Sequence, residues 1–162
     1  MGKLKRTNQR QKTMAIYLDY EGMIALKYFK FNVSRKISME PGAMANRENA
    51  LPKLNTVYIE KFSDVSTAAL FNVSVAGSEG KRATLHFVRT GTHKPVEYMT
   101  CTMENCLISE YFIFHIDLIK APHEQIYLSY TSLEISATAR DAKNQSAGIS
   151  RHNYNLVTAA GG

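Results

Sequence analysis

The chain has 162 residues, and 44% of them are apolar while 21% are charged, which is enough to build one domain with a buried core. No apolar run approaches the ~20 residues that a membrane-spanning helix needs or resembles the core of a cleaved signal peptide, so we expect neither membrane insertion nor signal-dependent export. The formal net charge is +6, but much of it lies in the first residues, so it does not indicate a nucleic-acid-binding groove.

Residues 1–13 form a basic leader that contains no acidic residue and almost nothing apolar. Such a segment is expected to be disordered, with a single folded domain over residues 14–162. A translation start at Met14 would open the protein directly on its first strand. Contact of the leader with RNA or anionic lipid is the less favoured interpretation.

Alternating apolar residues predict strands over residues 15–20 and 28–35, because side chains alternate between the two faces of a strand. In the second strand, Phe29 and its apolar neighbours point one way. The opposite, polar face carries Lys30, Asn32 and Ser34.

Residues 37–55 break all periodicity and contain Pro41-Gly42. A stretch of this length without regular structure is uncommon inside a compact domain and usually has a function. Its scattered apolar residues, among them Met39, Met44 and Leu51, indicate that it packs against something.

A strand over residues 56–62 leads into a predicted helix that Ser63 or Asp64 can cap and that Gly77 can end in the left-handed conformation. Residues 71–75 also alternate as a strand would, but helical spacing is favoured. That spacing is carried by Val65, Ala68, Ala69, Asn72, Val73 and Ala76.

The rest of the chain is predicted to be strands. Residues 82–89 and 96–103 flank a turn containing Gly91, as in a hairpin. Residues 107–118 continue the alternation, and residues 124–138 shift parity near Thr131-Ser132, which predicts a β-bulge or bend. A polar loop over 141–148 and a last strand over 149–157 follow, and the Ala-Gly end is expected to fray.

The sequence contains no pattern typical of an enzyme, a cofactor site or a metal site. Its five His residues lack ligand spacing with Cys or carboxylates. Cys101 and Cys106 are an odd number of residues apart, so we expect them on opposite faces of a strand, without a disulfide. The Tyr and Phe residues could form a stacking surface for single-stranded nucleic acid, but a place in the core is favoured.

Several motifs occur in an order that resembles one family. The first is Lys61-Phe62-Ser63-Asp64-x-Ser66-Thr67-x-x-Leu70, at the entry to the predicted helix. Residues 104–109, ENCLIS, and residues 122–130, PHEQIYLSY, follow, and residues 151–155, RHNYN, close the chain. In this order, over nearly the whole chain after the leader, they are similar to Hcp, the tube protein of bacterial type VI secretion systems and a relative of contractile-phage tail tubes.

This resemblance implies a mainly β fold, a compact two-sheet β-barrel with one short α-helix and a long extended loop. It also implies a non-enzymatic tube subunit that forms homo-hexameric rings, which stack into a hollow tube. The tube would be assembled in the cytoplasm with a contractile sheath and a spike protein. It would then be expelled with effectors, without a cleaved signal peptide, cofactor, nucleic acid or membrane insertion.

Candidate residues follow from combining the patterns with this resemblance. The irregular loop is the candidate for ring stacking, and the polar strand faces are candidates for the channel wall. The stacking candidates are Met39, Pro41, Met44, Arg47 and Leu51, and the channel candidates are Lys30, Asn32, Ser34, Thr84 and His86. A phage-type tail tube protein and a monomeric barrel that binds a ligand or RNA are the alternatives.

Overall fold

The computed structural model describes residues 14–42, 47, 50–90, 94–118, 121–143 and 145–162. The elements before the helix are β1 (Met14–Asp19), β2 (Met23–Leu26), β3 (Tyr28–Lys30), β4 (Val33–Arg35), β5 (Pro52–Leu54) and β6 (Val57–Phe62). The helix α1 (Thr67–Ala76) is followed by β7 (Lys81–Arg89), β8 (Val96–Phe114), β9 (His123–Ser129), β10 (Ser132–Arg140), β11 (Ser146–Asn155) and β12 (Ala160–Gly161). The expectation of a mainly β fold with one short helix is confirmed.

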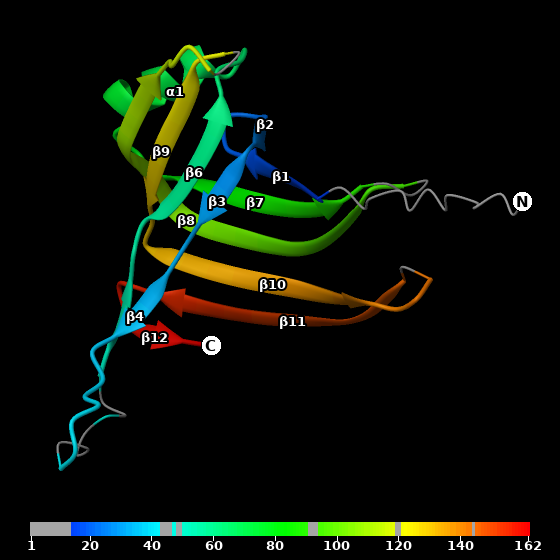
Figure 1. Cartoon of the computed structure of the whole chain (residues 1–162). Helices are drawn as coiled ribbons and strands as arrows, with labels where there is room; N and C mark the ends of the chain where they lie inside the picture. Colours follow the sequence, from blue (N-terminus) through cyan, green and yellow to red (C-terminus); the bar gives the residue numbers. More distant parts are fainter. Residues whose placement is uncertain (1–13, 43–46, 48–49, 91–93, 119–120, 144) are drawn as a thin grey trace, which may run out of the picture.

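The strands form two main sheets that share β8 (Figure 1). The large sheet has the order β12-β11-β10-β8-β7-β1-β2, and the small sheet has the order β3-β6-β9-β8. The first half of β8 belongs to the large sheet and the second half to the small one. On the opposite side the chain passes from β2 into β3, so the two sheets enclose the core between them.

The core consists of the facing side chains of the two sheets, including Leu18, Leu85, Ile59 and Ile126, all of which are fully buried. Ring contacts tie the sheets together where β3 crosses the large sheet: Phe29 meets Phe87 edge-on, with ring centroids 5.1 Å apart. The alternation that the sequence shows in residues 15–20, 56–62 and 82–89 is therefore the alternation between core and outer faces.

The two cysteines are free, as expected, but both are buried on the core side, which corrects the expectation that they face opposite ways. A β-bulge lies between them: Lys81 pairs with Cys106 but Ala83 pairs with Met103, so one extra residue restores the facing. Asn105 in the bulge adopts a left-handed φ of 55°. A side chain at Gly80 would clash with it, since a Cβ there would lie 2.6 Å from the Asn105 carbonyl carbon.

The helix is present, but it begins later than predicted. Its N-cap is Ser66 rather than Ser63 or Asp64, and Ser66 makes no side-chain cap. Asp64 instead organises the turn before the helix by accepting a hydrogen bond from the Ser66 backbone N–H at 2.8 Å. The helix stops at Gly77 as predicted, but Gly77 is extended, with φ −69° and ψ 106°, and not left-handed. A Cβ at that position would lie 2.4 Å from the Val73 carbonyl oxygen.

Other predicted boundaries also change. Residues 28–35 are two strands, β3 and β4, and the stretch predicted to be irregular contains β5, which pairs antiparallel with β4. The short strand β2 was missed, and β8 ends at Phe114. The predicted bend near Thr131 is confirmed, since β9 lies in the small sheet and β10 in the large one. The C-terminal end does not fray: β12 pairs with β11.

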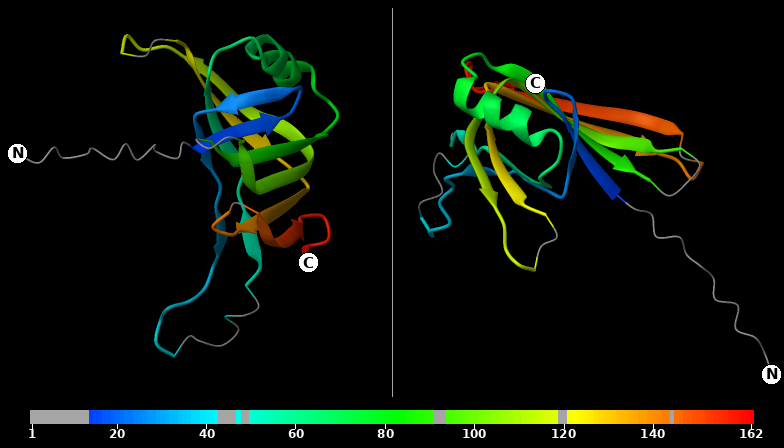
Figure 2. Two further views of the ribbon diagram at one scale, coloured as in Figure 1. Left: turned by 90° about the vertical axis from the view of Figure 1, so that its right-hand side faces the viewer. Right: turned by 90° about the horizontal axis from the view of Figure 1, so that it is seen from above.

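Two parts project from the packed sheets. The arm, which we define as the described residues between 33 and 54, begins and ends with the β4–β5 ladder and extends away from both sheets (Figures 1 and 2). The tips of β10 and β11 project in another direction, beyond the edge of the small sheet (Figure 2). Among the described residues, no helix is long and apolar enough to cross a membrane.

Candidate functional site

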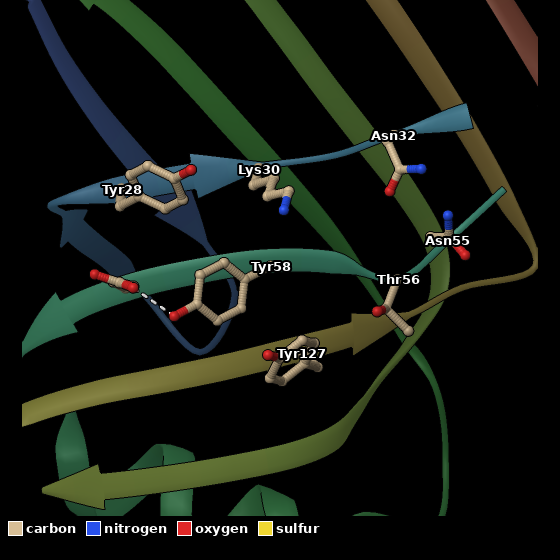
Figure 3. Close-up of a pocket in the computed structure, with 8 residues that line it drawn as sticks. Tyr28, Lys30, Asn32, Asn55, Thr56, Tyr58 and Tyr127 are labelled. Atoms are coloured by element: carbon tan, nitrogen blue, oxygen red, sulfur yellow. Dashed lines mark hydrogen bonds between the residues drawn. The ribbon is translucent and has the colours of Figure 1, made fainter. Parts of the chain in front are cut away.

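A hollow of about 470 Å³ lies on the outer face of the small sheet. Figure 3 shows side chains from neighbouring strands facing this hollow, with tyrosines beside polar groups. The lining residues are Tyr28, Lys30, Asn32, Asn55, Thr56, Tyr58, Glu60 and Tyr127.

An aromatic row, Tyr28, Tyr58, Tyr127 and Phe112, crosses the four strands of the small sheet. Tyr58 and Tyr127 are direct cross-strand partners, with ring centroids 4.8 Å apart. Tyr28 stands edge-on to Tyr58 at 5.9 Å, and Phe112 stands edge-on to Tyr127 at 6.3 Å. Cross-strand aromatic pairs stabilise a sheet, and here they also leave a continuous aromatic surface outside the core.

Glu60 carries the negative charge of this face. Burial raises the pKa of its carboxyl, but hydrogen bonds from Tyr58 and His123 outweigh the burial and bring the pKa below its ordinary value. The His123 Nε2 lies 2.9 Å from a Glu60 carboxylate oxygen, and Tyr58 donates its hydroxyl to the other oxygen. The ionised carboxylate is therefore anchored in the sheet.

The structure brings together only some of the residues that the sequence suggested for a channel wall. Lys30 and Asn32 line the hollow, whereas Ser34 lies in β4 on the arm. Thr84 and His86 lie in β7 of the large sheet, away from the hollow. There, His86 Nδ1 lies 2.6 Å from a Glu97 carboxylate oxygen.

Sequence reasoning missed the three tyrosines and Glu60. It assigned strand aromatics to the core, which is correct for Tyr20 and Phe87 and wrong for the aromatic row. A signal was available, because Tyr58 and Glu60 alternate with the buried Val57 and Ile59. Residues that alternate with the core must face outward.

Both edges of the small sheet lack a partner among the described strands. At one edge β3 pairs only with β6, and at the other edge residues 107–114 of β8 pair only with β9. The second edge also carries the exposed apolar side chains of Phe112 and Ile113. An edge strand of this kind is a template for pairing with another chain.

The arm carries exposed apolar residues at the positions suggested for stacking. Met39 is 78% exposed and Leu51 is 73% exposed, and Pro41 is exposed as well. Arg47 lies against Met39, with its guanidinium nitrogen 3.8 Å from the sulfur. Met44 lies outside the described residues.

A buried polar cluster accounts for the motif at the entry to the helix. Lys61 and Glu124 are both fully buried, and the Lys61 ammonium lies 2.5 Å from Glu124 and 3.0 Å from Asp64. Thr67 donates its hydroxyl to Glu124 at 3.0 Å, and Tyr111 donates to the other carboxylate oxygen. The cluster thus links β6, β9, β8 and the start of α1, which is a structural role.

The described residues contain neither a metal-binding cluster nor a readily ionised thiol. No group of three or more His, Cys, Asp or Glu within that part of the chain could hold a metal ion. Burial raises the pKa of both thiols to about 12, so neither is a nucleophile at neutral pH. What the arrangement can do is present an aromatic and polar face, two free strand edges and an apolar arm.

Comparison with protein families gives a match to the model described as "Type VI secretion system effector, Hcp", over residues 15–136. Comparison with curated proteins finds no match.

Among solved structures, the chain is similar to a type six secretion system protein, at 15% identity and a TM-score of 0.80 over 93% of this chain and 100% of that one. It is also similar to Hcp1 from Salmonella typhimurium, at 14% identity and a TM-score of 0.69 over 91% and 98% of the two chains. A type VI secretion system effector from Yersinia pestis matches at 16% identity and a TM-score of 0.60 over 88% and 99%.

At these identities the solved structures establish the fold, and the family match establishes the relationship. The chain belongs to the Hcp family of type VI secretion proteins, a family of secreted tube components.

Proposed function

We propose that this Hcp-family chain is a structural subunit of a type VI secretion tube. Six copies form a ring, rings stack into a hollow tube, and contraction of the surrounding sheath expels the tube together with the spike protein and effectors. The subunit is assembled in the cytoplasm and leaves the cell by this route. Residues 14–162 act as one domain, with residues 1–13 as a leader.

The observation that carries this proposal is the pair of free edges on the small sheet. All neighbouring strands in this sheet are antiparallel, and each copy contributes four of them. The first and last strands therefore run in opposite directions, so β8 of one copy can pair antiparallel with β3 of the next. Because two different edges meet, the pairing is heterologous, and it closes into a ring when the rotation between neighbouring copies is a whole fraction of a full turn.

In such a ring, the outer face of the small sheet lines the channel. The core lies behind the other face, so the hollow with Lys30 and Asn32 faces the space that the ring encloses. Tyrosines offer contact area at low entropic cost, while Glu60 and Lys30 keep the wall hydrated. We leave Thr84 and His86 out of the channel wall because they lie in the large sheet.

The arm supplies the contact between successive rings. It extends beyond the sheets along the direction of β3 and β6 (Figure 1), and its residues Met39, Pro41 and Leu51 are exposed. Flexible thioether side chains suit a surface that must fit a repeated partner. Arg47 supports Met39 within the arm.

Native mass spectrometry combined with negative-stain imaging of the purified protein tests the proposal. We expect a sixfold particle with an open centre. A stable monomer at micromolar concentration would contradict the proposal, and a monomer that also binds RNA with salt-dependent affinity would support the binding-protein alternative.

A further inference from the structure

The helix α1 exposes an apolar face without any charge. Its sequence, TAALFNVSVA, contains no charged residue, whereas the solvent side of a helix is normally polar. Phe71 is 54% exposed and Val75 is 67% exposed, and they lie one turn apart, flanked by the exposed Ala68. Only Leu70 of this helix is buried.

The large sheet exposes a second uncharged apolar surface where it projects beyond the small sheet. Along β10, alternate residues face the core side: Leu133 is buried, but Ile135, Ala137 and Ala139 are exposed. Their side is the one that the small sheet covers elsewhere. We call this surface, Ile135, Ala137 and Ala139 with the neighbouring Met99, the floor. It borders a shallow hollow of about 560 Å³ between β8, β10 and β11.

The helix face and the floor match in length and chemistry. A ten-residue helix is about 15 Å long, and residues 135–139 of an extended strand span roughly 17 Å. The alanines of the floor and Gly148 beside them leave room for the larger side chains Phe71 and Val75. Neither surface carries a charge that would have to be desolvated.

The two surfaces cannot meet within one molecule, because α1 and the tips of β10 and β11 lie at opposite ends (Figures 1 and 2). They can meet between copies that pair as proposed above. The helix lies beside the free half of β8, where the Tyr111 hydroxyl reaches the Thr67 carbonyl at 3.5 Å. The floor begins where the cover of β3 ends. Phe87, which contacts Phe29 of β3, pairs with Met99 at the start of the floor.

We propose that α1 of one copy docks on the floor of the next copy, so that each ring joint combines strand pairing with helix-on-sheet packing. This inference rests on the proposed ring. The docking contact explains why one face of the helix carries no charge. It also adds apolar buried area to an interface that would be small if it consisted of strand pairing alone. Stable interfaces bury about 800 Å² on each partner.

A disulfide cross-link tests this contact directly. In the double variant Val75→Cys/Ala139→Cys, mild oxidation is expected to join successive copies into a ladder that ends at the hexamer on a non-reducing gel. The native Cys101 and Cys106 are buried and do not contribute. The matched control Val75→Cys/Val157→Cys places the second thiol on an exposed valine away from the floor, and no ladder is expected.

A charge on the helix face gives a second measurement. Phe71→Glu is expected to raise the subunit concentration needed for ring formation at least tenfold. Val157→Glu, the same kind of change at an exposed residue away from the helix face and the floor, is expected to leave ring formation unchanged. Circular dichroism confirms that both variants fold. If rings form but the cross-link does not, or if Phe71→Glu forms rings at the wild-type concentration, the helix contact is wrong and the proposed tube function still stands. A wild-type protein that remains monomeric would overturn both proposals.

Discussion

At the scale of single residues, Glu124 holds the junction between the helix and the small sheet. Its carboxylate accepts hydrogen bonds from Lys61, Thr67 and Tyr111, and Lys61 is fully buried beside it. Removing one partner of a buried ion pair leaves the other charge without compensation. The residues Lys61, Asp64 and Thr67 therefore stabilise the fold. They do so through contacts that include Glu124, which lies far from them in the sequence.

We expect Glu124→Ala to lower the free energy of unfolding by about 3–5 kcal/mol, measured by urea denaturation. The matched control is Glu134→Ala, which breaks the surface pair with Arg151 and should cost at most about 1 kcal/mol. A loss below about 1 kcal/mol for Glu124→Ala would show that the cluster does not stabilise the fold.

The two cysteines make a prediction about reactivity. Burial raises the pKa of Cys101 to about 12 and is the main cause of the same rise at Cys106. At pH 8 both thiols should therefore be protonated and should react with a thiol reagent only as fast as the protein unfolds. Absorbance assays of labelling, with and without denaturant, measure this. Rapid labelling of the native protein would mean that one thiol lies at the surface.

The cysteines also show what sequence reasoning at this scale lacks. Parity along a strand predicted opposite faces for Cys101 and Cys106, and the bulge at Glu104–Asn105 reversed the parity. A bulge of one inserted residue depends on how the strand pairs with its neighbours, and the sequence around Glu104–Asn105 does not reveal it. The change of alternation near Thr131, in contrast, is visible in the sequence. Likewise, alternation with the core could have shown that Tyr58 faces outward, but its place between Tyr28 and Tyr127 depends on strand order.

At the scale of elements, the arm is the part whose role can be separated from the rest. The β4–β5 ladder brings Arg35 opposite Pro52, so residues 38–50 can be replaced by a short Gly-Ser turn without disturbing either sheet. We expect this variant to form rings that no longer stack, with tube length measured by negative-stain imaging. Tubes of wild-type length would contradict the assignment of the arm.

Elements with strong alternation were predicted well, since β1, β6 and β7 follow directly from their patterns. The sequence singled out the irregular stretch as a candidate for stacking but did not predict β5 within it, because three residues containing a proline carry no periodic signal. The helix began late because Asp64 forms a turn with Ser66 and does not itself cap the helix. Local hydrogen bonding thus determines where the helix begins, which the spacing of its apolar residues could not define.

At the scale of the whole molecule, the sequence predicted a mainly β, two-sheet fold through ordered motifs, each of them weak. It could not predict which sheet faces a channel, because that depends on which strands lack partners. In the described structure, those strands are β3 and the second half of β8, both at the edges of the small sheet. The proposed channel wall and the proposed contact between neighbouring copies therefore both depend on these two unpaired edges of the small sheet.

A cryo-electron microscopy reconstruction of the assembled particle tests the pairing of these edges most directly. We predict a ladder between residues 107–114 of one copy and residues 28–30 of the next, with Lys30 and Tyr127 facing the central channel. A ring in which these two edges do not meet, or in which the small sheet faces outward, would contradict the account.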